Sequence, residues 1–193
     1  MRSRHRAAAI AAALTAVEYD ANAQGWDALP VLLGLFDTTI HRHQPRINAD
    51  ELGIDPAFWW LHSQTVPGMR LPYWMGLKTL TAHLTAPDTP PWLTRRAPFG
   101  HRRLAGLAFL AEGLDTSETG RRDAAAHGLP AHPDGTPVRA LTACDIEGRH
   151  YQILRIRGSA TTTTTVVLDD PPAPVRATVI PTCLRRLLTA ARD

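Results

Sequence analysis

The sequence predicts an α+β fold in which helices pack against one mainly antiparallel sheet of about four to six strands. Three observations support this prediction. The chain has 193 residues, which suits one domain spanning residues 1–193. Three segments carry apolar residues at helical spacing, and several short runs of aliphatic and β-branched residues are separated by turn residues. The order of helix, strand, helix, further strands and a final helix is typical of a layered α+β domain.

The first expected element is an amphipathic helix, because Ile10, Leu14, Val17 and Ala21 follow one another at helical spacing. Gly25, which follows Gln24, is a suitable helix stop.

The same segment has the outline of a signal peptide, with basic residues 1–6, an apolar stretch and the small residues Ala21 and Ala23 near a cleavage point. The alanine-rich stretch and the acids Glu18 and Asp20 argue against secretion. The sequence therefore favours a cytoplasmic protein, and secretion after cleavage near Ala23 is the alternative. No stretch reaches the roughly 18 apolar residues of a membrane span, so no membrane partner is expected.

Five segments are expected to form strands. The apolar run 31–36 is opened by Pro30 and closed by Asp37. The run 104–111 suits a strand or a helix, and its glycine and bounded length favour a central strand. Segments 138–144 and 150–157 flank the turn residues Asp145 to Gly148 and predict a hairpin. The threonine run 161–165 leads into the apolar residues 166–168, a composition that favours a strand.

A middle helix is expected from Pro72 to Leu84, because proline suits the first helical position and Leu77, Leu80 and Leu84 share one face. A short helix beginning at Pro181 or Thr182 closes the chain. The proline-rich segments of about 41–70 and 86–100 are expected to be irregular, with the first anchored to the core by residues 58–61. The polar segment of about 115–137 is expected to be a mobile loop.

The basic residues are unusual because Lys78 is the only lysine among 21 lysines and arginines. With abundant alanine, threonine, proline and glycine, this bias indicates a GC-rich bacterial or phage genome. The doublets 95–96, 102–103, 121–122 and 185–186, with the N-terminal arginines, are arranged as a phosphate-binding face would require. Acids are interleaved with them and the net charge is only +3, which favours an ordinary solvated surface. Weak nucleic-acid binding through the doublets remains an alternative.

Catalytic motifs are scarce in this sequence. It contains no glycine-rich phosphate loop, no GxSxG elbow, no HExxH and no paired CxxC. No cofactor and no catalytic residue are therefore assigned. Cys144 and Cys183 have no metal-site spacing and are interpreted as buried, reduced and structural, while a disulfide between them stays open.

Histidines support one enzymatic alternative. His41 and His43 would lie on one face of an extended segment, and His127 and His132 flank a turn in the long loop. Together with Glu112 as general acid or base, they would suit a metal-dependent hydrolase. Exposed loop histidines, and a Glu112 that ion-pairs with an arginine, are the favoured interpretation.

Tryptophans and arginines gather in or beside the proline-rich segments, and both residue types dominate protein interfaces. The candidate binding residues are Trp59, Trp60, Trp92, Arg95, Arg96, Arg102 and Arg103. Covering the core is the competing explanation for the tryptophans. Trp26 and Asp27, which join the first helix to the first strand, are interpreted as architectural: a buried indole braced by a capping carboxylate.

The segment Gly25-Trp-Asp-Ala-Leu-Pro-Val-Leu-Leu-Gly-Leu-Phe-Asp37 resembles a Gly-Trp-Asp-x-x-Pro pattern in small uncharacterised actinobacterial and actinophage proteins. The pair Glu112-Gly113 and the segment Tyr151-Gln-Ile-Leu-Arg-Ile-Arg-Gly158 are similar to that group as well. The resemblance covers about a third of the chain. It implies a bacterial cytoplasmic or phage origin and supplies no activity or site residues.

Taken together, a complete set of core segments without a convergent polar constellation predicts a non-enzymatic interaction or regulatory module. Its expected partner is another protein, with nucleic acid as the alternative.

Overall fold

The computed structural model describes residues 2–37, 54–60, 73–88, 103–162 and 164–191. Within these residues the chain forms five helices and six strands. The helices are α1 (Arg2–Gln24), α2 (Tyr73–Leu84), α4 (Glu118–Ala126), α5 (Ala173–Ala177) and α6 (Val179–Ala190). The strands are β1 (Val31–Asp37), β2 (Ile54–Trp60), β3 (Arg103–Asp115), β4 (Thr136–Asp145), β5 (His150–Ile156) and β6 (Thr164–Leu168).

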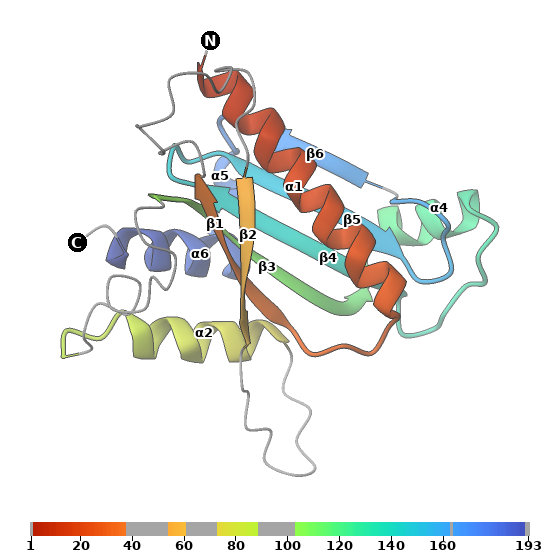
Figure 1. Ribbon diagram of the computed structural model, residues 1–193. Helices are drawn as coiled ribbons and strands as arrows, with labels where there is room; N and C mark the ends of the chain where they lie inside the picture. The colour runs from red at the N-terminus through yellow and green to blue at the C-terminus, as the bar shows by residue number, and fades with distance from the viewer. Residues whose placement is uncertain (1, 38–53, 61–72, 89–102, 163, 192–193) are drawn as a thin grey trace.

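The six strands form one sheet in the order β2-β1-β3-β4-β5-β6, and each neighbouring pair is antiparallel. The α+β prediction is therefore confirmed. β3 and β4 occupy the centre of the sheet, and β2 and β6 are its two outermost strands (Figure 1). The predicted hairpin consists of β4 and β5, with Ala143 opposite Tyr151 next to the turn.

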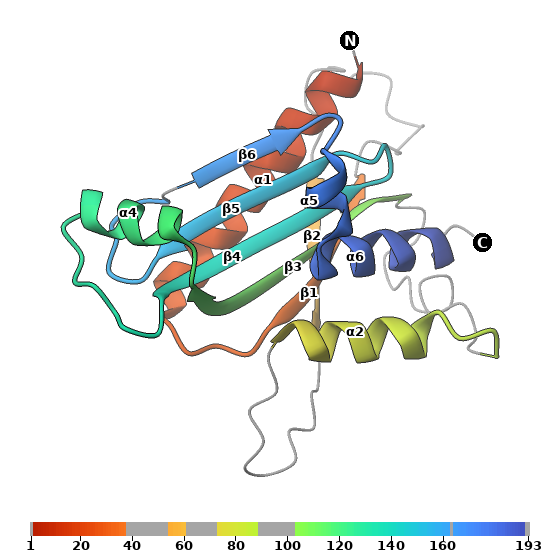
Figure 2. The same cartoon turned by 180° about the vertical axis from the view of Figure 1, so that it is seen from behind.

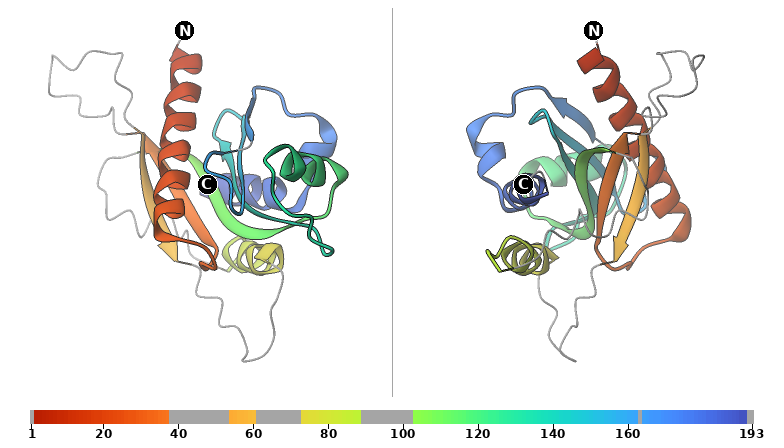
Figure 3. Two further views of the ribbon diagram at one scale, coloured as in Figure 1. Left: turned by 90° about the vertical axis from the view of Figure 1, so that its right-hand side faces the viewer. Right: turned by 60° about the vertical axis from the view of Figure 1, so that its left-hand side comes forward.

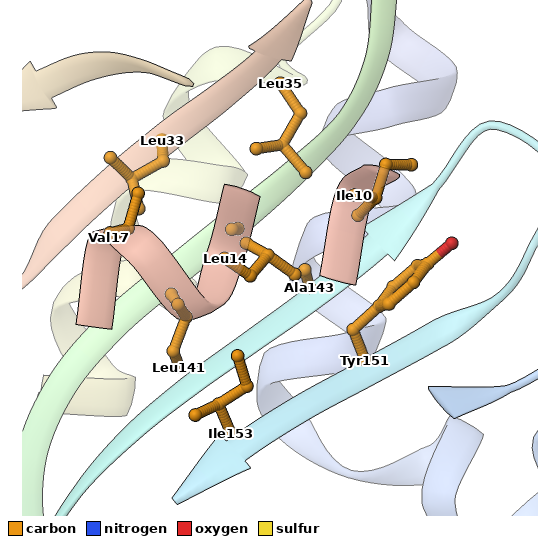
Figure 4. Packing of buried hydrophobic residues seen from close by; sticks show 10 residues of the cluster. Ile10, Leu14, Val17, Leu33, Leu35, Leu141, Ala143, Tyr151 and Ile153 are labelled. Atoms are coloured by element: carbon orange, nitrogen blue, oxygen red, sulfur yellow. The ribbon is translucent and has the colours of Figure 1, made fainter. Parts of the chain in front are cut away.

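Helix α1 crosses one face of the sheet, as the views in Figure 1 and Figure 3 show. Ile10, Leu14 and Val17 are buried against the sheet, as their helical spacing predicted. Figure 4 shows these side chains meeting strand residues from β1, β4 and β5, among them Leu141 and Tyr151. The first helix is thus an integral layer of the folded domain.

The opposite face is covered by α2 and α6, with α4 and α5 near its margins (Figure 2). Leu77 of α2 and Leu184 and Leu187 of α6 pack with Leu107 and Phe109 of β3 in a second core cluster. Both helices were predicted, and α6 begins two residues before the predicted Pro181. The sheet is therefore enclosed between two helical layers.

Two parts of the sequence prediction are wrong. Residues 54–60, within the segment 41–70 expected to be irregular, form strand β2, which pairs with β1 over its whole length. Residues 118–126, within the expected loop 115–137, form helix α4. The Ser117 side chain caps this helix by accepting a hydrogen bond from the Gly120 N–H at 3.0 Å. The segment 86–100 lies almost entirely outside the described residues.

Candidate functional site

Two buried arginines stand side by side on the face of the sheet that α1 covers. Arg139 of β4 lies directly opposite Arg155 of β5, and Glu112 of β3 lies opposite Arg139 on its other side. Each arginine is only 1% exposed. Two like charges in adjacent strands repel each other, so this arrangement requires carboxylates in close contact.

Glu18 of α1 supplies one of these carboxylates. The side chain is fully buried and forms a two-pronged ion pair with Arg155: Nε donates to Oε1 at 2.6 Å and Nη2 donates to Oε2 at 2.7 Å. The hydrogen bonds that Arg155 donates to Glu18 raise the pKa of its guanidinium above its ordinary value. Arg155 Nη1 also donates to the carbonyl of Ala160 at 2.9 Å. The ion pair links α1 to strand β5.

Glu112 supplies the second carboxylate. Arg139 donates from Nε and Nη2 to Glu112 Oε1 at 3.1 and 2.8 Å, and Nη2 also donates to the carbonyl of Gly25. Arg139 Nη1 lies 3.9 Å from Glu18 Oε1 and has no hydrogen-bond partner among the described residues. The expected ion pair of Glu112 with an arginine is confirmed, but Glu112 is mostly buried and does not end the strand, because β3 continues to Asp115.

The connection between α1 and β1 is held over this cluster. The ring of Trp26 is stacked on the guanidinium of Arg139 at 4.4 Å and lies 5.5 Å from that of Arg157. The Asp27 N–H donates to Glu112 Oε2 at 2.7 Å, and Asp27 accepts two hydrogen bonds from Arg157. Asp27 adopts a left-handed conformation with φ of 68°. These contacts agree with the expected bracing role of Asp27, whereas Trp26 is half-buried rather than buried.

A pocket of about 800 Å³ opens beside the cluster, where α1 ends. Its walls come from α1, the α1–β1 connection, β1, β3 and Arg139 of β4. Most of the lining is apolar, and Leu29 at the pocket is 57% exposed. The lining residues are Val17, Asp20, Ala21, Ala23, Gln24, Gly25, Trp26, Ala28, Leu29, Val31, Leu110, Ala111, Glu112 and Arg139.

A second polar cluster lies at the β4–β5 turn. The buried Tyr151 hydroxyl donates to Asp145 Oδ2 at 2.8 Å, and Arg149 contacts the same carboxylate oxygen at 3.3 Å. Burial, followed by the Asp145 carboxylate, raises the pKa of Tyr151 well above its usual range. Arg6 of α1 donates to Glu147 in this turn at 2.7 Å. The helix is thus tied to the sheet by ion pairs near both of its ends.

The cysteines lie in the core between α6 and the sheet: Cys183 belongs to α6 and Cys144 to β4. Cys144 and Cys183 are buried free thiols, in agreement with the structural interpretation. Burial raises the pKa of Cys144 to about 11. His150 beside them is buried, and burial together with the nearby charge of Arg185 lowers its pKa. A buried, protonated thiol is a poor nucleophile, so these groups are core components.

Three of the candidate binding residues of the sequence analysis can be placed on strands of the sheet. Trp59 and Trp60 belong to β2, opposite Leu32 and Val31 of β1, and Arg103 begins β3. Trp92, Arg95, Arg96 and Arg102 lie outside the described residues. The described lining of the pocket contains none of the three residues that can be placed.

The metal hypothesis remains a prediction. His41 and His43 lie outside the described residues, and among the rest no group of three potential metal ligands is present. His127 ends α4, where its Nδ1 lies 2.8 Å from the carbonyl of Asp123, and His132 is exposed. Both oxygens of Glu112 already accept hydrogen bonds from the protein.

The arginine doublets that can be described belong to different helices. Arg121 and Arg122 lie on α4, whereas Arg185 and Arg186 lie on α6 over another part of the sheet (Figure 2). Not all the arginines belong to the expected solvated surface, because Arg139 and Arg155 are buried.

Sequence reasoning missed Glu18, Arg139 and Arg155, although each had a detectable pattern. Glu18 continues the apolar stripe of Ile10 and Leu14 at the next four-residue step, so it had to face the core. Arg139 precedes the buried Leu141 by two residues, so both face the same side of the sheet. A charged residue that continues the spacing of core residues along a helix or strand predicts a buried ion pair.

None of the helices in the described part of the chain is long and apolar enough to cross a membrane. Comparison of the chain with protein-family models, curated proteins and solved structures found no match.

Proposed function

We propose that this domain is a non-enzymatic interaction module that binds another protein through the pocket beside Arg139. The observation that carries the proposal is an open, mostly apolar pocket whose walls are held by buried ion pairs. Such a pocket is suited to receive an apolar side chain of a partner, because its shape exists before binding and little ordering cost remains.

The chemistry of the lining supports binding rather than catalysis. The described lining contains no serine, threonine, cysteine, histidine, tyrosine or lysine, and its acid–base groups are the carboxylates of Asp20 and Glu112. Its Glu112 and Arg139 are engaged with each other. The exposed Leu29 adds apolar surface at the pocket that a partner would cover.

The proposal is tested by filling the pocket. Ala28 lines the pocket and is exposed, so Ala28→Trp should occupy the space without disturbing the core. The matched control is Ala82→Trp, which places the same side chain at an exposed position of α2 on the opposite face of the sheet. Both variants should fold with wild-type circular dichroism and thermal midpoints.

The assay is affinity capture from a lysate of the organism that carries the gene, followed by binding measurements with the purified partner. We expect a partner that wild type and Ala82→Trp retain and that Ala28→Trp loses. Equal capture by all three proteins, or turnover of a substrate by the purified chain, would count against the proposal.

We further propose a bacterial or phage origin and a cytoplasmic location. The resemblance of the Gly25 to Asp37 segment supports the origin. The location is supported by Ile10, Leu14 and Val17, whose burial makes the first helix part of the folded domain. The intact mass of the protein isolated from its own cells tests the location: retention of residues 1–23 is expected, and a mature chain beginning near Gln24 would contradict it.

A further inference from the structure

Strand β6 forms one edge of the sheet. In the described part of the chain it pairs only with β5, so one row of its backbone N–H and C=O groups has no strand beside it. Unpaired edges of this kind accept further strands, and proteins commonly protect them with charged residues, proline or bulges. The sequence of β6, Thr-Thr-Val-Val-Leu, contains none of the charged or proline residues that provide such protection.

The side chains of β6 also favour pairing. Thr165 and Val167 lie opposite Ile153 and Tyr151 of β5, so they are on the face that carries α1. Both are exposed, Val167 by 41%. β-Branched residues fit well on a pleated surface and contribute to cross-strand contacts. Addition of a strand would cover part of this apolar surface.

We propose that β6 pairs antiparallel with β6 of a second copy of this chain, in a register centred on Val166. In this register Thr165 of each copy lies opposite Val167 of the other, and Thr164 lies opposite Leu168. Residues of the same parity face each other, so the backbone groups that point away from β5 in one copy meet those of the other. The strand is therefore complementary to itself.

The charges that follow β6 select this orientation. Asp169 and Asp170 come directly after the strand. In the antiparallel pair, the aspartates of the two copies lie at opposite ends of the paired strands. A parallel pair in register would instead place Asp169 and Asp170 of one copy directly beside Asp169 and Asp170 of the other. Like charges directly opposite are destabilising, so the antiparallel arrangement is favoured. It would join two six-stranded sheets into one continuous sheet and is independent of the pocket.

The test uses complementary charges at the two exposed positions. Thr165→Lys with Val167→Lys places lysine opposite lysine at both contacts, and Thr165→Glu with Val167→Glu places glutamate opposite glutamate. Each double variant alone should dimerise about tenfold or more weakly than wild type in sedimentation equilibrium. An equimolar mixture places lysine opposite glutamate at both contacts and should restore the dimer.

A control variant carries two lysines elsewhere, at the exposed alanines Ala82 and Ala125, and should dimerise as wild type does. Restoration in the mixture shows that both double variants are folded. The proposal is overturned by a wild type that stays monomeric at all concentrations, by a dimer that persists in the lysine variant, or by a mixture that fails to associate. Ala28→Trp should leave the dimer intact, which separates this outcome from that of the pocket.

Discussion

Removal of the Glu18 carboxylate is expected to be one of the most destabilising single polar substitutions in this domain. In Glu18→Gln the neutral side chain no longer compensates the charge of Arg155, which is 1% exposed and cannot turn to water. Two charge-assisted hydrogen bonds, of 2.6 and 2.7 Å, are lost or weakened. Breaking a buried ion pair by removing one partner typically costs about 3–5 kcal/mol. This is a large part of the roughly 5–15 kcal/mol that stabilises a typical domain.

The assay is thermal and urea unfolding of purified protein followed by circular dichroism. For a chain of this size a loss of about 3–5 kcal/mol lowers the midpoint by roughly 6–20 °C. The control is Asp170→Asn, which breaks the exposed pair between Asp170 and Arg176, whose side chains are 89% and 50% exposed. It should cost less than about 1 kcal/mol.

A second comparison separates charge from packing. Replacing both partners, Glu18→Met with Arg155→Met, removes the buried charges together, and apolar replacements of buried ion pairs are often neutral or stabilising. The double variant should therefore be more stable than Glu18→Gln. The reasoning from burial would be refuted if the melting midpoints of Glu18→Gln and Asp170→Asn both lay within a degree or two of the wild-type midpoint.

Four further predictions follow from the structure. Tyr151→Phe should cost roughly 1.5–3 kcal/mol in urea unfolding, because the buried Asp145 carboxylate loses a hydrogen-bond donor at 2.8 Å; an unchanged midpoint would contradict this. The pKa of the Cys144 thiol is raised from 9.0 to about 11, so its protonated form contributes stability that is present below pH 9 and is lost as the pH rises from 9 to 11. A thiol reagent should modify Cys144 at neutral pH only after unfolding. Rapid modification of the native protein would refute its burial. Gly106→Ala should destabilise the sheet, since a Cβ there would lie 2.8 Å from the Cys144 carbonyl oxygen, and the cost of such overpacking is typically about 1–3 kcal/mol; a wild-type melting temperature would show that β3 and β4 can separate without loss. Deletion of residues 1–23 removes the whole layer over one face and should give insoluble or molten protein, whereas a cooperative melt at the wild-type midpoint would favour the secreted form.

The parts of the fold that the sequence predicted are those with strong local patterns. The apolar stripe of α1 and the turn residues between β4 and β5 act within a few residues, so they are visible without tertiary information. β2 was missed because Pro56 interrupts its strand pattern. A proline is tolerated there because β2 is an outermost strand, where one row of N–H groups needs no neighbouring strand. α4 was missed because it is polar and short, with Ala124 as its only buried side chain besides glycine.

The candidate site was harder to predict than the fold. Its central pair joins Glu18 to Arg155, 137 residues apart, and no local spacing relates the two. Individual residues could have been placed facing the core from periodicity, but their pairing depends on where α1 crosses the sheet. The pocket beside Arg139 arises from four separate elements and the connection after α1, so its existence is a property of the packed structure alone.

The separation of Glu18 from its partner has a consequence for how the chain matures on the ribosome. The helix is synthesised before the strands of the sheet, and Arg155 emerges only 137 residues after Glu18. At the usual 5–20 residues per second this interval lasts roughly 7–27 s. During that time Glu18 lacks Arg155, and the sheet beneath α1 is incomplete because β5 has not yet been made. The complete docking surface of α1 therefore exists only once β5 has been made, and shorter nascent chains leave part of this helix face exposed.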